Sequence, residues 1–262
     1  MELPKPMKYA IMSDAHANPL ALETALADAR SLGCEKLVFA GDMTGYGYDA
    51  KATLGLVREN FDVVLLGNHD SACAGLEPAR EVAMLSSYAL DVEARDKLSS
   101  ADLEWLRELP LTHAEGGFAV VHGDFTKPKA WEYIYSAEAV ERNFGKRRER
   151  LMFCGHTHHA MVWEETGKGA VREQLADRFA RPALKPESVS FKLAKSRYLV
   201  NCGSVGYPRT DLCSSYAIFD SSSKEVCVRR LPFDFKSYIT EMLKRDLPLP
   251  NWLTEILLAA TR

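Results

Sequence analysis

The stretch "LMFCGHTHH" (151–159) sets three histidines into four residues, directly after a short apolar run and a glycine. An apolar run of this length is too short for a helix and is typical of a buried strand. The whole chain of 262 residues contains only seven histidines. Their concentration at the end of one predicted strand indicates a loop with a chemical role.

The same design recurs along the chain, because other short apolar runs also end in a polar or glycine-containing cluster. These runs are "KYAIMSD" (8–14), "KLVFAGD" (36–42), "VVLLGNHD" (63–70), "FAVVHGD" (118–124) and "YLVNCGS" (198–204). Helical patterns with capping residues lie between them, at 18–33, 99–110 and 136–145. Alternation of strand and helix predicts an α/β fold with parallel strands.

The second half of the chain is less regular. Two runs, 215–220 and 226–231, are separated by a short turn and predict a hairpin at the end of a second sheet. The segment 164–196 is polar and interrupted by glycines and prolines, so we interpret it as a flap or insertion in a single domain, 1–262. The tail predicts two short amphipathic helices separated by prolines.

The polar clusters at the strand ends share a small set of residue types. They contain Asp14, His16, Asp42, Asn68, His69, Asp70, His122, His156 and His158. Because the carboxyl ends of parallel strands open at one edge of a sheet, these motifs can meet in one cleft. Carboxylate, imidazole and carboxamide ligands without thiolate favour Mn, Fe, Zn, Co or Ni. Two such ions about 3.5–4 Å apart are a standard device for hydrolysing phosphate esters.

Capping or loop hydrogen bonding would explain any one of these residues alone. That explanation weakens because five of the seven histidines fall in the clusters. The motifs are "SDAHAN" (13–18), "GDMTGYG" (41–47), "GNHD" (67–70), "HG" (122–123), "GHTH" (155–158) and "NCGSVG" (201–206). In this order they resemble those of calcineurin-like metallophosphoesterases, specifically the small prokaryotic YfcE-like phosphodiesterase branch.

The resemblance implies a four-layer αββα sandwich and two divalent transition-metal ions, with Mn favoured among Mn, Fe, Zn, Ni and Co. It implies these ligands: for the first ion Asp14, His16 and His158; for the second ion Asn68, His122 and His156; and Asp42 as the bridge between them. His69 would face the substrate as general acid or phosphate stabiliser, and Asp70 would orient its ring. His159 is expected to be a surface histidine.

The resulting functional hypothesis is a metal-dependent phosphoesterase that hydrolyses a small phosphodiester or phosphomonoester with a hydroxide bridging two metal ions. A non-catalytic scaffold of the same fold is one alternative, but it would be expected to lack ligands that this chain keeps. A protein phosphatase or symmetrical dinucleoside-tetraphosphatase is another. Those relatives carry an arginine shortly after the first "GD" and "GNHE" instead of "GNHD", and this chain has neither.

Several residues near the motifs have two interpretations. The aromatic segment with Trp131, Tyr133 and Tyr135 either walls the substrate pocket or packs in the core. Arg209 and the glycines of "GSVG" either approach a substrate phosphate or form a tight turn.

Composition limits the partners and the compartment. The net charge of −3 does not suggest a nucleic-acid partner, and no apolar run is long enough to span a membrane. The six cysteines include no Cys-x-x-Cys pair and are expected to be reduced thiols. We therefore expect a cytoplasmic protein without a membrane partner. The sequence is compatible with both a monomer and a homo-oligomer.

Overall fold

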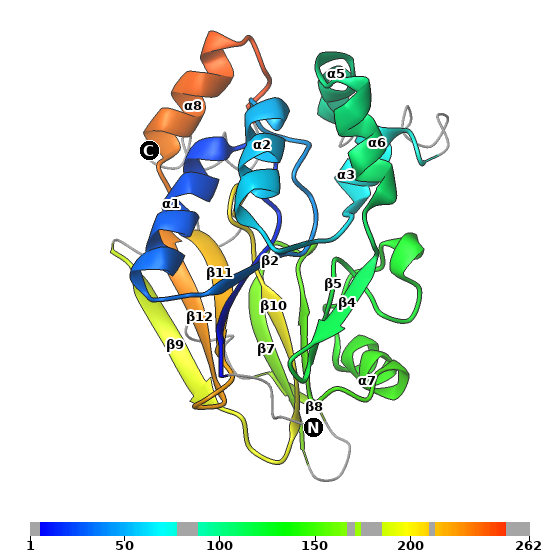
Figure 1. Ribbon diagram of the computed structural model, residues 1–262, viewed down its shortest axis with the longest axis vertical. Helices are drawn as coiled ribbons and strands as arrows, with labels where there is room; N and C mark the ends of the chain where they lie inside the picture. Colours follow the sequence, from blue (N-terminus) through cyan, green and yellow to red (C-terminus); the bar gives the residue numbers. More distant parts are fainter. Residues whose placement is uncertain (1–5, 78–88, 167–170, 174–184, 210–212, 250–262) are drawn as a thin grey trace, which may run out of the picture.

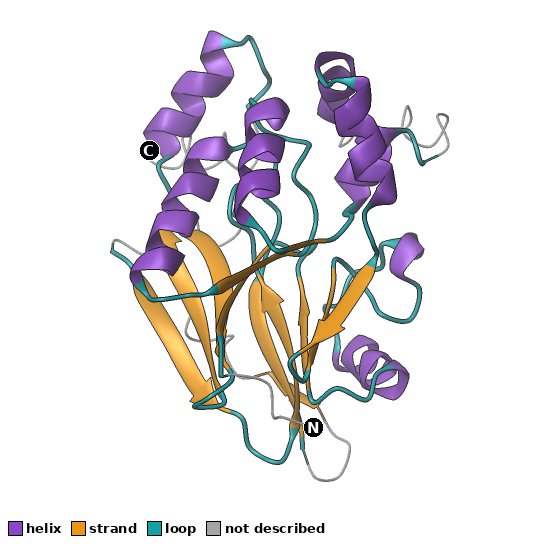
Figure 2. Cartoon of the chain, viewed as in Figure 1, coloured by secondary structure: helices purple, strands orange, loops and turns teal. Residues whose placement is uncertain are grey.

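A computed structural model describes residues 6–77, 89–166, 171–173, 185–209 and 213–249. Two six-stranded β-sheets make up its centre, and helices lie outside them (Figures 1 and 2). The hydrophobic core is divided accordingly into clusters between the sheets and beneath the helices. The predicted four-layer αββα sandwich is confirmed.

The first sheet combines a parallel half with an antiparallel half. Its strand order is β3 (Val63–Val64), β2 (Lys36–Phe39), β1 (Lys8–Met12), β11 (Cys213–Asp220), β12 (Glu225–Pro232) and β9 (Glu187–Lys192). The first three strands are parallel. Helices α1 (Pro19–Ser31) and α2 (Ala50–Asn60) make the crossovers between them, as the alternation of patterns predicted.

The predicted hairpin exists, but its predicted place in a second sheet is wrong. Strands β11 and β12 pair with each other, and β11 pairs antiparallel with β1 in the first sheet. All residues of β11 except the last are buried, which is the pattern of a central strand covered on both faces. The hairpin therefore extends the sheet that the first strands begin.

The second sheet carries the other motif strands. Its order is β4 (Thr112–Glu115), β5 (Phe118–Val121), β6 (Leu151–Cys154), β10 (Arg197–Cys202), β7 (Ala160–Glu165) and β8 (Val171–Glu173). Strands β5, β6 and β10 are parallel. Helix α7 (Ala137–Lys146) follows the 3-10 turn η2 (Pro128–Ala130) and connects β5 to β6; in Figure 1 it lies at the lower right, apart from the other helices.

Alternation along the strands explains the four layers. In β1, Tyr9 and Ile11 belong to the core between the sheets, whereas Ala10 and Met12 belong to the core beneath α1 and α2. Strand β6 repeats this pattern, because its odd-numbered residues face the other sheet and its even-numbered residues face α7. Successive side chains of a strand point to opposite faces, so two-sided burial requires such continuous apolar runs.

The helix starts follow the predicted caps. The Asn18 side chain accepts from the Ala21 N–H at 3.2 Å, and Ser99 and Ser136 cap the helices that follow them. The remaining helices are α3 (Asn68–Ala74), α5 (Ala89–Lys97), α6 (Ser100–Glu108) and α8 (Phe235–Lys244). Helix α8 is the first of the two predicted tail helices, and the second, in 250–262, lies outside the described residues.

The segment 164–196 contributes strands to both sheets. It holds the end of β7 and all of β8 and β9, and the last two are edge strands. Residues 167–170 and 174–184 lie outside the described residues, so a flap here stays a prediction. The six cysteines all fall in the described part and form no disulfide. None of the described helices has the length and apolar content needed to cross a membrane.

Candidate metal centre

The strand ends of both sheets converge on one site. Asp14 and His16 follow β1, Asp42 follows β2, and His122 follows β5. We expected one parallel sheet to bring these loops together. Instead the carboxyl ends of two packed sheets supply them, and α3 begins at Asn68 immediately beside them.

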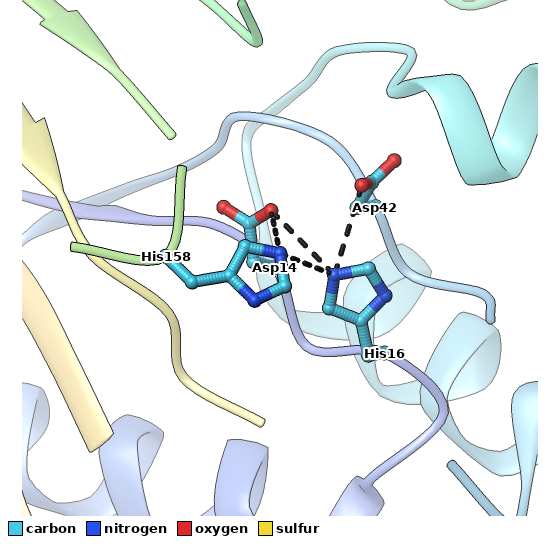
Figure 3. A group of neighbouring side chains, drawn as sticks. All are labelled: Asp14, His16, Asp42 and His158. Atoms are coloured by element: carbon cyan, nitrogen blue, oxygen red, sulfur yellow. Dashed lines mark hydrogen bonds and ion pairs between the residues drawn. The ribbon is translucent and has the colours of Figure 1, made fainter. Parts of the chain in front are cut away.

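The first ligand group consists of Asp14, His16, Asp42 and His158, all of them buried. The side chains point toward one another in Figure 3. His158 Nε2 lies 3.2 Å from Asp14 Oδ1 and 3.0 Å from His16 Nε2. His16 Nε2 is also 3.6 Å from Asp14 Oδ1 and 3.7 Å from Asp42 Oδ2. Four donor atoms thus surround one small space.

The second ligand group consists of Asp42, His122 and His156, with Asn68 beside them. His122 Nε2 lies 3.2 Å from Asp42 Oδ2, 3.1 Å from His156 Nδ1 and 3.1 Å from Asn68 Oδ1. Asp42 Oδ2 therefore faces histidines of both groups. The structure brings all seven proposed ligands together, with Asp42 between the two groups; their roles as ligands stay predictions.

Hydrogen bonds to backbone carbonyls orient all four imidazoles. The pairs are His16 Nδ1 with Thr44 O, His122 Nδ1 with Ala40 O, His156 Nε2 with Trp131 O, and His158 Nδ1 with Tyr207 O, at 2.8–2.9 Å. Because a carbonyl oxygen only accepts, each of these ring nitrogens donates. The other nitrogen of each ring then faces the ligand groups, which is the usual support of a metal-binding histidine.

In both carboxylates, Asp14 and Asp42, one oxygen accepts a backbone hydrogen bond and the other does not. Asp14 Oδ2 accepts from the His156 N–H at 3.0 Å, and Asp42 Oδ1 accepts from the His69 N–H at 2.9 Å. Their second oxygens, Asp14 Oδ1 and Asp42 Oδ2, are buried without a hydrogen-bond donor in the described part of the chain. A buried acceptor without a partner is costly. Divalent cations fit here, because they would satisfy both oxygens and the ring nitrogens that face them.

The electrostatics of the site also suit a cation. Burial lowers the pKa of His16 to about 4 and that of His156 to about 3, so both rings are neutral at pH 7, as metal ligation requires. For His122 burial acts in the same direction, but the Asp42 carboxylate outweighs it and raises the pKa to about 9. In the metal-free protein, Asp42 thus favours a proton on His122. A metal ion bound by His122 would have to displace that proton.

The backbone is strained where these ligands stand. Five of them have positive φ: Asp14 (58°), His16 (44°), Asp42 (62°), His156 (68°) and His158 (63°). The left-handed region is uncommon for residues other than glycine. Such strain concentrates at functional sites, where surrounding structure holds it.

His69 makes a different contact from the one predicted. Its Nδ1 lies 2.6 Å from Oδ2 of Asp91, a buried carboxylate on α5. Asp70, the predicted partner, instead accepts from the N–H groups of Asp42 (2.8 Å) and Met43 (2.9 Å). The assignment of Asp70 as the residue that orients the ring is therefore wrong. Consecutive residues of a helix point in different directions, and His69 and Asp70 both belong to α3.

Sequence reasoning missed Asp91 because no motif surrounds it. The one related signal is Gly45 in "GDMTGYG". Gly45 has a φ of +82°, and a Cβ there would lie 2.3 Å from His69 Nδ1 and 3.1 Å from Asp91 Oδ1. A side chain at position 45 would thus occupy the space in which the His69 ring meets Asp91.

Two pairs of tyrosines pack against histidines of the site. The inner tyrosine pair, Tyr46 and Tyr207, is stacked with ring centroids 4.4 Å apart, and Tyr46 lies 4.5 Å from the His69 ring. In the outer tyrosine pair, Tyr133 stacks on His156 at 4.1 Å and on Tyr135 at 5.5 Å. Tyr133 and Tyr135 are each 47% exposed, which favours the pocket-wall interpretation over core packing.

His159 lies outside both ligand groups. It is half-buried and its ring contacts Tyr135 edge-on, with centroids 5.8 Å apart. The third histidine of the opening stretch therefore belongs to the rim of the site.

Comparison with known proteins identifies the class. The family model described as the calcineurin-like phosphoesterase superfamily domain matches residues 7–224. The chain therefore belongs to the calcineurin-like phosphoesterase superfamily, and the prediction made from its motifs is confirmed at that level. Family membership supports a hydrolase that uses divalent metals.

Two individual relatives match nearly the whole chain, and a third matches about half of it. The crystal structure of a metallophosphoesterase from Sphaerobacter thermophilus is 33% identical, with a TM-score of 0.75, and the match covers 93% of this chain and 96% of that one. An uncharacterised protein of Methanocaldococcus jannaschii is 29% identical over 94% of this chain and 95% of its own length. A symmetrical bis(5'-nucleosyl)-tetraphosphatase from Nitrosospira multiformis is 33% identical, but the match spans only about half of each protein, 53% and 51%.

Proposed function

We propose that this protein hydrolyses a small phosphate ester with two divalent metal ions, Mn²⁺ being the first to test. The observation that carries the proposal is the position of Asp42 Oδ2, which faces His16 at 3.7 Å and His122 at 3.2 Å. One buried oxygen that faces two ligand groups is placed where two ions could share it. When bound, the ions would supply acidified water and positive charge for the phosphate oxygens.

In this proposal His69 delivers a proton to the leaving group. Its Nδ1 donates a hydrogen bond to Asp91, so Nε2 is the ring nitrogen that would give its proton to the leaving group. Burial lowers the pKa of His69, but Asp91 and Asp42 outweigh burial and raise it above the ordinary histidine value. The raised pKa favours the protonated ring, which is the form that a general acid needs.

The test is reconstitution of purified, chelator-treated protein with Mn²⁺, Fe²⁺, Zn²⁺, Ni²⁺ or Co²⁺ in turn. Each form is assayed with a phosphomonoester and a phosphodiester. We expect no turnover without metal, restored turnover with at least one ion, and none in Asp42→Asn. Absence of turnover with every ion and ester would instead support the non-catalytic scaffold.

A dinucleoside polyphosphate is a second candidate substrate. It is favoured by the tetraphosphatase relative and by the exposed outer tyrosine pair, since nucleobases stack on aromatic rings. The absence of an arginine shortly after the first "GD" argues against it. Hydrolysis of diadenosine tetraphosphate faster than of a simple diester, and loss of that advantage in Tyr133→Ala, would support it. Equal rates for both substrates would reject it.

A further inference from the structure

Glu77 is a side chain close to the site that the proposed chemistry does not use. It follows Gly75, the residue that caps the end of α3, and it belongs to none of the motifs. Its Oε1 accepts two hydrogen bonds, from the indole Nε1–H of Trp131 at 3.0 Å and from the hydroxyl of Ser71 on α3 at 2.7 Å. Glu77 therefore ties α3 to a loop that lies 54 residues further along the chain.

Trp131, at the other end of this tie, contacts the second ligand group twice. Its carbonyl oxygen accepts from His156 Nε2 at 2.8 Å, and its ring meets the His122 ring edge-on, with centroids 6.1 Å apart. The loop passes so close that a Cβ on Gly123 would lie 3.2 Å from the Glu132 carbonyl oxygen. Because the Trp131 carbonyl only accepts, the proton of a neutral His156 ring is on Nε2, and Nδ1 stays available for a metal ion.

The backbone at Trp131 is held in a strained conformation. Its φ is +53°, in the left-handed region that is uncommon for residues other than glycine. Strained backbone persists only where surrounding contacts hold it. The hydrogen bond to Glu77 is such a contact, because it is directional and fixes the indole of the strained residue.

The tie connects two proposed ligands of one ion. Helix α3, which carries Ser71, begins at Asn68, and Asn68 Oδ1 lies 3.1 Å from His122 Nε2. The loop at the other end orients His156 through the Trp131 carbonyl. Glu77 thus joins the helix that carries Asn68 to the residue that holds the His156 ring.

We propose that Glu77 is a positioning residue for the second metal ion, because it holds Trp131 where the Trp131 carbonyl fixes the His156 ring. This inference rests on the function proposed above. Groups that orient a metal ligand from behind raise the affinity for the ion, since they fix the tautomer and the direction of the ring. The first ion should not depend on Glu77, because the carbonyls of Thr44 and Tyr207 orient its two histidines.

The experiment compares Glu77→Ala and Glu77→Gln with wild type. Crystals of each protein are equilibrated with a series of Mn²⁺ concentrations, and anomalous scattering gives the occupancy of each ligand group separately. Glu77→Ala should lower the affinity of the second group for Mn²⁺ by about tenfold, with little change in the first. Glu77→Gln should resemble wild type, because an amide oxygen still accepts from Trp131 and Ser71.

A second variant tests whether Glu77 acts through Trp131. Trp131→Phe removes the Nε1–H and keeps an aromatic ring, so it should reproduce the loss of Glu77→Ala. The double variant should lose no more than either single variant, since both remove the same hydrogen bond. Glu141→Ala, an exposed position on α7, is the control and should bind both ions as wild type does.

Three results would overturn the inference while leaving the proposed function intact. They are equal losses in both ligand groups, an unchanged second group in Glu77→Ala, and additive losses in the double variant. The melting temperature of each metal-free variant is measured, so that a general loss of stability is recognised as such.

Exchange of the His156 Nε2 proton gives a readout that needs no metal. In the metal-free protein this proton is hydrogen-bonded to Trp131, and its NMR signal is identified by its loss in His156→Ala. Exchange with water should be at least about tenfold faster in Glu77→Ala than in wild type or Glu77→Gln. If wild type binds no second ion, the two-metal function fails and this measurement alone decides about Glu77. Equal exchange in Glu77→Ala and wild type would then reject its role.

Discussion

Asp91 accepts a hydrogen bond from the ring of His69 at 2.6 Å, although 22 residues separate the two in sequence. Both side chains are buried, and they come from different helices, α3 and α5. In the proposed function, this pair fixes which ring nitrogen of His69 would be directed at the substrate. Asp91 is therefore a positioning residue for the proposed proton donor.

Replacing Asp91 tests this relationship. Asp91→Asn should lower kcat by about 10–100-fold with little change in KM, because the ring loses its charged partner and its fixed orientation. Metal content should stay at the wild-type level, since Asp91 belongs to neither ligand group. Glu93→Gln is the matched control on α5, because Glu93 pairs with Lys97 at the surface. If Asp91→Asn and wild type had equal kinetics, Asp91 would not be a positioning residue for His69.

His69→Ala should retain both metals and lose turnover. The loss should reach about 10²–10⁴-fold for an ester with an alkoxide leaving group, which needs protonation. It should be smaller for an activated aryl ester, whose leaving group departs without a proton. Kinetics on such a matched pair of substrates decides the role, with metal analysis of both proteins. An equal loss on the two would mean that His69 only positions the phosphate.

The two ligand groups should be separable by mutation. His158→Ala removes a ligand atom of the first group, and His156→Ala removes a ligand atom of the second group. Each variant should therefore lose more of the ion in its own group than of the ion in the other group. Asp42→Asn should weaken both, because its Oδ2 faces both. The measurement is metal content by elemental analysis after dialysis against limiting Mn²⁺. Identical losses in all three variants would mean that the groups do not bind independently.

Asp70 should matter for stability. Its carboxylate accepts from the N–H groups of Asp42, Met43, Thr44 and Gly67, at 2.8–3.2 Å. Asp70→Asn would turn an NH₂ group toward some of these donors. The free energy of unfolding should fall by about 2–4 kcal/mol, measured by urea denaturation of the metal-free protein. An unchanged midpoint would contradict this role of Asp70 in stability.

The sequence predicts the centre of this fold well because its signals are local. Apolar runs that end in polar clusters identify β1, β2, β5, β6 and β10, and Asn18, Ser99 and Ser136 mark helix starts. Which strands pair with each other is harder to predict from the sequence. A hairpin such as β11–β12 can extend either sheet, and only packing against β1 decides the choice.

The same distinction holds in the site. The proposed ligands occur in short motifs, so their types and spacing identify them. Asp91 does not, because its contact with His69 arises only in the tertiary structure. Sequence adjacency even misleads at Asp70, where the helical geometry of α3 turns a neighbouring side chain away from the ring.

The most direct test of the central claim is anomalous scattering from crystals of the wild-type protein loaded with Mn²⁺. We predict two peaks, one within each ligand group, about 3.5–4 Å apart, with the Asp42 carboxylate between them. A single peak, with Asp42 as a terminal ligand of one ion, would contradict the two-metal account.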